Sequence, residues 1–207
     1  MEHLRPGADP TVFGLSGYSG AGTVPITDVN GKPGSAPKVT AESLQGGVKV
    51  YSLTDHIHER EASHHLSGLT GRPEGVRVGF VPTVGGWFSG IMSTASVPLK
   101  GRYRASEIVE MFEERYRGER LIRISRDVPM LGDVAGKHGW CAGGFQVHSG
   151  GERVVLVGGL DNLLKGAATQ CMQVSFKIMN LRLNIADAEQ NLNLALGLDE
   201  HAGIPLR

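Results

Sequence analysis

The chain has 207 residues, of which 40% are hydrophobic and 20% are charged, with 21 basic and 21 acidic side chains. This is the composition of a folded globular protein of one or two domains, and the zero net charge excludes the basic surface that nucleic acid binding requires. The longest apolar runs are far shorter than the roughly 20 residues of a membrane span. The sequence therefore predicts neither a nucleic acid nor a membrane partner.

The first half of the chain predicts short strands and one helix. Glycine and proline recur through residues 11–50, which favours loops with short strands. Residues 54–66 contain neither and begin with polar capping candidates, so we expect a helix there. Residues 76–81 and 91–97 predict two strands, which we expect to pair across the glycine-containing turn at 83–90.

The second half predicts helices and strands in mixed order. Apolar residues at helical spacing across 105–117 predict a surface helix that Ser106 caps. Strands are expected at 121–125 and 153–157, on either side of a glycine-rich stretch. A further helix is expected at 161–172. This order predicts an α+β fold with a mixed sheet.

A glycine-rich motif, Ser-Gly-Tyr-Ser-Gly-Ala-Gly, occupies residues 16–22. A phosphate-binding loop continues directly into a helix, whereas residues 23–34 contain two prolines and two glycines and cannot open one. A dinucleotide fingerprint is therefore not expected here. The glycines remain candidates for a wall of a substrate pocket, where backbone amides approach an acyl or phosphate oxygen.

Four of the eight histidines lie within residues 56–65. On a helix His56 and His58 would point away from each other, and no third ligand is grouped with them, so a metal site is not expected. A catalytic base is the better interpretation, because an imidazole beside acidic residues titrates near neutral pH. His64 and His65 are interpreted as polar surface residues of the helix.

The two cysteines, Cys141 and Cys171, are too few for a disulfide scaffold or a four-thiolate metal site. Cys141 follows His138 closely, which leaves a nucleophile open, but a lone cysteine is more often a small buried hydrophobic residue. Cys171 lies on the apolar stripe of the predicted helix and is interpreted as structural.

Polar residues open the helix predicted at 161–172. Asp161, Asn162 and Lys165 group a carboxylate, an amide and an ammonium within one turn. Such a group can hold a carboxamide or a phosphate, or Asp161 can simply cap the helix. Both interpretations remain open at this point.

Six segments of the chain together resemble the N-acetyl-γ-glutamyl-phosphate reductases of arginine biosynthesis. The sequence is especially similar to the reductase half of a fungal mitochondrial protein in which acetylglutamate kinase is fused to this reductase. The likeness runs over nearly the full length and rests on the segments SGYSGAGT, LTDHIHEREASHHL, FVPTVGGWFSGIMSTASVPL, HGWCAGGF, GGLDNLLKGAATQCMQ and NLNLALGLDEHAGI.

The resemblance implies an oxidoreductase that uses NADPH to reduce an acyl phosphate to an aldehyde through a cysteine thioester. In the family the nucleophile lies in an Asn-Pro-Gly-Cys stretch before the glycine-rich motif, and this chain does not contain that stretch. The implied site residues are His56 and His58 for catalysis, Ser16, Gly17, Gly20 and Glu61 for substrate binding, and Asn162 and Lys165 for the cofactor.

The resemblance also implies how the chain is organised. Residues 1–160 correspond to a catalytic and dimerisation domain of semialdehyde-dehydrogenase type. Residues 161–207 correspond to a helix that returns to a nucleotide-binding domain absent from this chain. We expect NADP(H) to be bound mainly by that absent domain, and the chain alone to be inactive as a reductase.

The resemblance implies a small-molecule substrate. It also implies a homo-oligomer, because sheet faces of this family pair between subunits. A non-catalytic oligomerisation module is the alternative. The resemblance implies a mitochondrial matrix location, although the first ten residues carry no export or transit signal.

Residues 174–190 are interpreted as a translated intron, with a real loop at a helix break as the alternative. Their apolar residues alternate instead of following the helix period, and the 17 codons can begin and end with splice-site sequences. Their removal joins Gln173 to Asn191 and predicts one uninterrupted helix.

Overall fold

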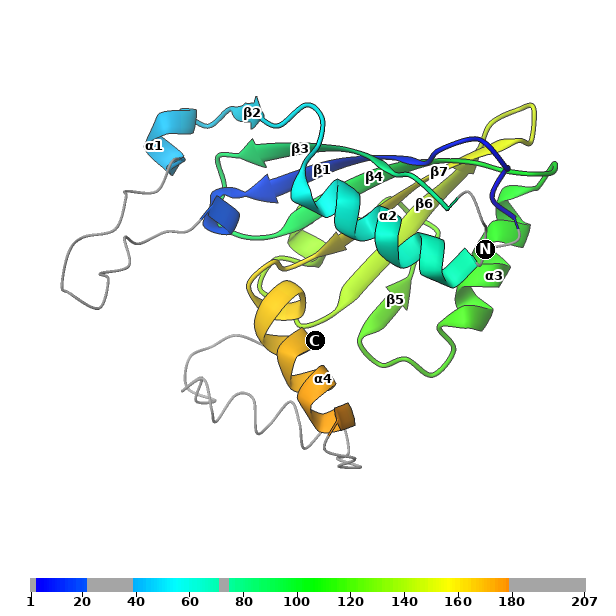
Figure 1. Cartoon of the computed structure of the whole chain (residues 1–207). Helices are drawn as coiled ribbons and strands as arrows, with labels where there is room; N and C mark the ends of the chain where they lie inside the picture. The colour runs from blue at the N-terminus through cyan, green and yellow to red at the C-terminus, as the bar shows by residue number, and fades with distance from the viewer. Residues whose placement is uncertain (1–2, 22–38, 71–74, 179–207) are drawn as a thin grey trace.

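A computed structural model describes residues 3–21, 39–70 and 75–178 (Figure 1). Seven strands form one sheet in the order β2-β3-β1-β4-β7-β6-β5. The pairs β1–β3 and β5–β6 are parallel and the other pairs are antiparallel, so the predicted α+β fold with a mixed sheet is confirmed. The strands are β1 Thr11–Gly17, β2 Val48–Val50, β3 Gly79–Gly85, β4 Ile91–Pro98, β5 Ile122–Ile124, β6 Trp140–Val147 and β7 Arg153–Leu160.

Four α-helices accompany the sheet in the described ranges: α1 Ala41–Leu44, α2 Ile57–Thr70, α3 Ala105–Arg115 and α4 Thr169–Ile178. Short turns of other helix types lie at Tyr18–Ala21 (η1), Leu131–Asp133 (η2) and Leu164–Ala168 (η3, a π-turn). Helices were expected near α2, α3 and α4, and all three are present. None of the helices in the described part of the chain is long and apolar enough to span a membrane.

Helix α3 begins at Ala105, the first residue of the predicted range, but its cap lies two residues before the predicted one. The Arg104 backbone amide donates a hydrogen bond of 2.6 Å to Oε2 of Glu107. The cap of the helix is therefore Arg104, with Glu107 reaching back to it, and the expected cap at Ser106 is wrong. Ser106 lies inside the first turn.

The strands that were expected to pair with each other, β3 and β4, are separated by β1. Leu15 of β1 pairs with Thr83 of β3 on one side and with Met92 of β4 on the other. The prediction that β3 and β4 form a hairpin is therefore wrong. The connection between them crosses over the end of β1, and amides of residues 17–19 donate to its carbonyl oxygens.

Strand β6 lies in the stretch that the sequence analysis described only as glycine-rich. A Cβ atom at Gly143 would lie 2.3 Å from the Asp127 carbonyl oxygen, and Gly144 has a φ of 63°. The glycines therefore allow a strand with a bulge to run close beside another backbone. The sequence signal for a strand was hidden because glycine carries no apolar side chain.

One face of the sheet, called here the helical face, is covered by α2 and α3. Residues that pair in register share a face, which places Phe80 of β3 on the same side as Leu156 of β7 through Val12 and Ala95. Helix α2 contacts Phe80, and α3 packs on β6 and β5. The core between α3 and the sheet is formed by Leu99, Ile108, Ala142, Phe145 and Val154.

The opposite side of the sheet, called here the open face, carries a second set of apolar side chains. Segment 125–137 covers one end of it, where Val134 packs against Gly159. The remainder is only partly buried, with exposed fractions of 53% for Phe13, 60% for Val48 and 48% for Val50. The other apolar side chains of this face are Leu15, Val81, Met92, Val155 and Val157.

Candidate functional site

The glycine-rich motif forms a turn at the end of β1 that is held by a second turn. Backbone amides of Gly17, Tyr18 and Ser19 donate hydrogen bonds of 2.9, 2.9 and 3.0 Å to three carbonyl oxygens of segment 87–90. A Cβ atom at Gly17 would lie 2.5 Å from the Phe88 carbonyl oxygen. Glycine is therefore required at this position so that the two backbones can touch.

Three of the predicted substrate residues and a predicted cofactor residue meet at this turn. A Cβ atom at Gly20 would lie 3.1 Å from Oγ of Ser16 and 3.8 Å from Nδ2 of Asn162. Asn162 donates to Oγ of Ser19 at 2.9 Å and accepts from the Gly90 amide at 2.8 Å. The structure therefore brings Ser16, Gly17, Gly20 and Asn162 into one group, the turn group.

Asp161 lies under the turn group and is 2% exposed. Its Oδ1 accepts the amides of Leu163 and Leu164 at 2.8 and 3.0 Å, which supports the capping interpretation, while the π-turn itself begins at Leu164. Its Oδ2 accepts the Ser89 hydroxyl at 2.9 Å and the Gly136 amide at 2.8 Å. Burial alone would raise the pKa of Asp161, but these four hydrogen bonds lower it below the usual value for a carboxyl group.

Lys165 lies in the π-turn η3, close to the turn group in sequence. Its Nζ donates to Oε1 of Gln170 at 2.6 Å and to Oε1 of Gln173 at 2.5 Å. Burial lowers the pKa of Lys165, while the charge of Glu119 acts in the opposite direction. The π-turn itself is built from the Gly166 amide donating to the Asp161 carbonyl oxygen at 2.8 Å, and turns of this kind are common at functional sites.

The predicted histidine pair forms a second group at the start of α2. His56 precedes the helix because Asp55 has a φ of 62°, and the rings of His56 and His58 lie with their centroids 4.8 Å apart. The His58 amide donates to Nδ1 of His56 at 3.2 Å. The expectation that the two rings point away from each other is wrong, because only His58 belongs to the helix.

Aromatic rings and a carboxylate surround the pair. The Phe80 ring lies 5.4 Å from the ring of His56 and 6.3 Å from that of His58, and Tyr51 lies 5.8 Å from His56. Nδ1 of His58 lies 2.8 Å from Oε2 of Glu61. Glu61 is therefore a partner of His58, and these five residues form the histidine group.

The environment of His56 favours its neutral form. Burial lowers its pKa, the neighbouring imidazole of His58 lowers it further, and the charges of Glu61 and Glu59 act in the opposite direction. A neutral imidazole can accept a proton at neutral pH. This environment of His56 is therefore suited to a general base. His64 and His65 are exposed, as expected for surface residues.

The turn group and the histidine group lie at different points along the same two strands. Phe80 pairs with Val12, whereas Ser16 pairs with Val84, four residues further along. At about 3.3 Å per residue this is a separation of roughly 13 Å. Within the described ranges, no hydrogen bond or ring contact joins the two groups.

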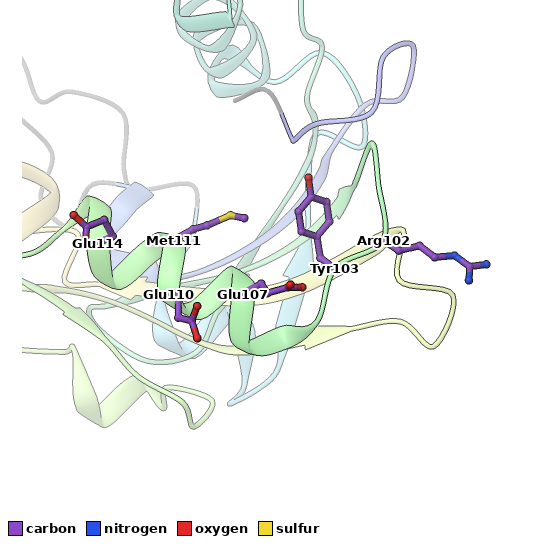
Figure 2. A pocket seen from close by; sticks show the side chains of 6 residues that line it. All are labelled: Arg102, Tyr103, Glu107, Glu110, Met111 and Glu114. Atoms are coloured by element: carbon purple, nitrogen blue, oxygen red, sulfur yellow. The ribbon is translucent and has the colours of Figure 1, made fainter.

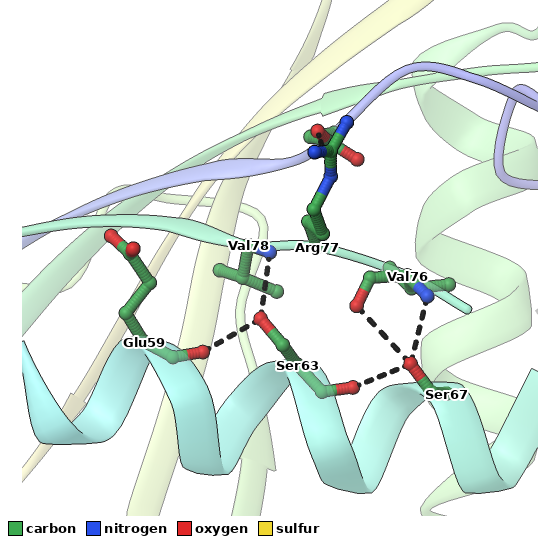
Figure 3. Close-up of polar contacts among 7 residues, drawn as sticks. Glu59, Ser63, Ser67, Val76, Arg77 and Val78 are labelled. Carbon is green, nitrogen blue, oxygen red and sulfur yellow. Dashed lines mark hydrogen bonds and ion pairs between the residues drawn. The ribbon is translucent and has the colours of Figure 1, made fainter. Parts of the chain in front are cut away.

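The sequence analysis missed the side chains that fix α2 beside β3. Ser67 accepts the Val76 amide at 2.8 Å and Ser63 accepts the Val78 amide at 3.0 Å (Figure 3). Oε2 of Glu59 accepts the Phe80 amide at 3.0 Å. Alternate amides of an extended segment point to the same side, and these three acceptors recur every fourth residue along one side of α2. This regular spacing of polar residues in the sequence could have predicted that one side of the helix binds backbone amides.

The cysteines do not resemble nucleophiles. Cys141 is 2% exposed, and burial raises the pKa of its thiol. Its neighbour in sequence, His138, contacts Oγ1 of Thr169 through Nδ1 at 2.7 Å, and both residues are buried. The interpretation of Cys141 as a buried residue is confirmed. Cys171 is exposed, so its interpretation as part of a buried apolar stripe is wrong.

Two further features lie outside both groups. A hollow of about 450 Å³ opens along α3 and contains none of the predicted site residues; its lining is Arg102, Tyr103, Glu107, Glu110, Met111 and Glu114 (Figure 2). Over residues 3–21, 39–70 and 75–178, no group of three His, Cys, Asp or Glu side chains is placed to hold a metal ion.

Helix α4 continues through Ile178, so residues 174–178 are helical, and the rest of the segment interpreted as an intron lies outside the described residues.

The mixed sheet with helices on one face is similar to a part of solved aspartate semialdehyde dehydrogenases. The structure of aspartate semialdehyde dehydrogenase II from Vibrio cholerae matches 84% of this chain and 56% of its own with a TM-score of 0.61 and 19% identity. At that identity the likeness concerns the fold alone. The chain belongs to the family described as semialdehyde dehydrogenase, dimerisation domain, whose model matches residues 1–162.

Curated relatives confirm the resemblance seen in the sequence. The chain is 42% identical over 196 residues to an N-acetyl-gamma-glutamyl-phosphate reductase of Stenotrophomonas maltophilia, covering 95% of this chain and 51% of the relative. It is 42% identical over 205 residues to "Protein arg-6, mitochondrial" of Neurospora crassa, covering 99% of this chain and 19% of the relative. The chain therefore spans about half of the bacterial relative and about a fifth of the fungal one.

Proposed function

We propose that this chain is the substrate-binding and dimerisation part of an N-acetyl-γ-glutamyl-phosphate reductase that acts in arginine biosynthesis. The observation that carries the proposal is the 42% identity to a bacterial reductase over 95% of the chain. The two groups described above lie in segments that carry this likeness. The word mitochondrial in the name of the fungal relative supports a location in the mitochondrial matrix.

The histidine group supplies the acid–base function in this proposal. His56 is held in its neutral form by burial and by His58, so it can accept a proton from the reacting group. Glu61 holds the ring of His58 through Nδ1 and orients it beside His56. His58 and Glu61 then bind the polar end of the substrate.

The turn group lines the acyl end of the substrate pocket in this proposal. The amides of residues 17–19 already donate to segment 87–90, so they shape this wall and do not bind the substrate. Segment 16–21 presents a serine hydroxyl and a glycine-lined backbone, which suit an acyl or phosphate oxygen. A separation of roughly 13 Å between the groups suits a flexible substrate with a polar function at each end. N-acetylglutamyl phosphate has that form.

Two residues that precede α4, Asn162 and Lys165, fit a nicotinamide cofactor, NADP(H). Nδ2 of Asn162 uses one hydrogen on Ser19, and Nζ of Lys165 uses two hydrogens on glutamine side chains. Each group keeps one hydrogen for a carboxamide or phosphate oxygen. The bound cofactor supplies the hydride. Asn162 and Lys165 orient its reactive end, while most of its binding comes from a domain outside this chain.

The open face supports assembly with a second copy of the chain. Apolar side chains that are half exposed on one side of a sheet form a self-complementary surface in symmetric dimers. We propose that two copies pair through this face. The same observation favours a second function, a non-catalytic oligomerisation module that associates with a complete reductase.

Reductase turnover is not expected from the 207-residue chain alone. Its buried cysteine has a raised pKa, which makes the thiol a poor nucleophile. Oxidation of N-acetylglutamate semialdehyde by NADP⁺ with phosphate tests this directly, since NADPH formation is measured at 340 nm. Turnover above the enzyme-free background would contradict the expectation.

Substrate binding tests the main proposal. N-acetyl-L-glutamate, titrated into the ¹⁵N-labelled chain, should shift the amide signals of Gly17, Ser19 and Gly20 and the ring signals of His56. L-aspartate at the same concentrations is the matched control ligand and should shift neither group. Equal effects of the two compounds, or none from either, would contradict the proposed substrate.

A further inference from the structure

The carboxylate of Asp161 joins three segments of the chain that are far apart in sequence. Its two oxygens accept four hydrogen bonds, from Ser89, Gly136, Leu163 and Leu164, at 2.8 to 3.0 Å. The side chain is buried, and every one of the four donors comes from the protein itself. Such a carboxylate is fixed in position by its surroundings and fixes them in turn.

A short series of contacts leads from this carboxylate to the turn group. The hydroxyl of Ser89 donates to Asp161, and the residues on either side of Ser89, Phe88 and Gly90, accept the backbone amides of Ser19 and Gly17. Gly90 also donates its amide to Asn162, the residue after Asp161. The turn at 87–90 therefore lies between the carboxylate and the glycine-rich turn and contacts both.

We propose that Asp161 is a positioning residue for the glycine-rich turn, acting through Ser89 and segment 87–90. It does not touch the substrate. Its effect is to set where the backbone of residues 17–19 lies relative to the start of α4. The proposal rests on the proposed function only where it treats this turn as part of the substrate site.

The four acceptor contacts explain why a carboxylate is needed at this position. An asparagine has one acceptor oxygen and a donor NH₂ group. In an Asp161→Asn variant, the NH₂ would face either the Ser89 hydroxyl and the Gly136 amide or the amides of Leu163 and Leu164. With the NH₂ toward Leu163 and Leu164, both amides would lose their acceptor. With the NH₂ toward Ser89 and Gly136, the hydroxyl can turn and accept but the Gly136 amide cannot, and buried donors without acceptors are costly.

Hydrogen exchange of the full 207-residue chain, followed by NMR, tests the proposal residue by residue. In Ser89→Ala the amides of Gly17, Tyr18 and Ser19 should exchange about tenfold faster, in line with the loss of one hydrogen bond to a charged group. Ser89→Thr keeps the hydroxyl and should restore slow exchange. Asp161→Asn should accelerate the same three amides and also either that of Gly136 or those of Leu163 and Leu164, according to the side that the NH₂ group faces.

Two controls separate positioning from general stability. Ser67→Ala removes a serine hydroxyl of similar burial that bonds the Val76 amide, and it should leave residues 17–19 unchanged. Amides of β7, such as those of Val155 and Val157, report global opening of the sheet. They should exchange at the wild-type rate in Ser89→Ala.

Either of two results would overturn the proposal. One is exchange at residues 17–19 within twofold of wild type in Ser89→Ala. The other is an equal acceleration of these amides and those of β7, which would make Asp161 a stabiliser of the whole domain. Where Asp161→Asn does not fold, the two Ser89 variants decide alone. A failure of N-acetyl-L-glutamate to bind the wild-type chain contradicts the proposed function and leaves the exchange result intact.

Discussion

The carboxylate of Glu59 accepts the backbone amide of Phe80 at 3.0 Å, and the Phe80 ring in turn lies against the rings of both His56 and His58. Glu59 thus connects the helix that carries His58 to the strand that supports the pair. The position of the histidine group depends on this contact between α2 and β3.

Replacement of Glu59 should weaken the docking of α2. Glu59→Ala leaves the Phe80 amide without its acceptor, and we expect a loss of about 1 kcal/mol in the free energy of unfolding. Glu59→Gln retains an acceptor oxygen and should lose less than half of that. Urea denaturation followed by circular dichroism measures both. Glu113→Ala, at an exposed position on α3, is the surface control, and an equal loss in that variant would argue against the contact.

Gly17 should not tolerate a side chain. Gly17→Ala places a Cβ atom within 2.5 Å of the Phe88 carbonyl oxygen, so one of the two turns must shift. We expect a loss of about 1–3 kcal/mol, typical of overpacking. Gly132→Ala meets no atom within 4 Å and is the matched control. Thermal denaturation compares the two variants, and similar melting temperatures would show that the turns are not in tight contact.

The pKa of His56 should lie below its usual value and respond to its neighbours with opposite signs. His58→Asn removes a neighbouring positive charge and should raise the pKa of His56, whereas Glu61→Gln removes a negative charge and should lower it. Titration of the imidazole ring signals by NMR measures each shift. Shifts of the same sign in both variants would contradict the assigned environment.

The same lowered pKa has a consequence for stability. Between the folded pKa and about 6.5, the unfolded state binds more protons at this position than the folded state. The contribution of His56 therefore makes the fold more stable as the pH rises through this interval and has no further effect above it. His56→Asn should flatten the dependence of the unfolding free energy on pH in this interval. An unchanged slope between wild type and variant would be the contrary outcome.

A charge on the open face should prevent self-association. Phe13→Glu and Val157→Glu each place a carboxylate among the half-exposed apolar side chains, and in a symmetric dimer the charges of two copies face each other. We expect monomers by sedimentation analysis at concentrations where the wild-type chain is dimeric. Leu69→Glu changes an equally apolar residue at the end of α2 and should leave the assembly unchanged. A monomeric wild-type chain would remove the basis of the proposed interface.

The helices were predictable from the sequence because their signals are local. Residues 105–117 carry an apolar stripe at helical spacing, and residues 54–66 lack glycine and proline, so α3 and α2 were found within a few residues of their ends. The strand order was not predictable, since it depends on which distant segment fills the gap between β3 and β4. Nothing in residues 11–17 shows that they pair with strands 70 or 80 residues away.

In the candidate site, too, local motifs were predictable from the sequence and long-range contacts were not. Ser16, Gly17 and Gly20 were named from one motif, and their neighbour Asn162 from another more than 140 residues later. The resemblance to a family predicted that these two motifs form one site. The spacing of residues along the chain could not have predicted it. His56 and His58 were judged by helix geometry, and that judgement failed because the positive φ of Asp55 puts the helix start between them.

The position of α2 has a consequence for the solubility of the folded chain. Strand β2 is only three residues long and pairs with β3 at residues 83–85, so the amides of Val76, Val78 and Phe80 lie on an edge that no strand among the described residues covers. Exposed edges of this kind recruit strands from other molecules and begin aggregation. Glu59, Ser63 and Ser67 occupy these amides, so the helix that carries His58 also blocks strand addition. A variant that releases α2 would lose the histidine pair and expose an aggregation-prone edge in the same step.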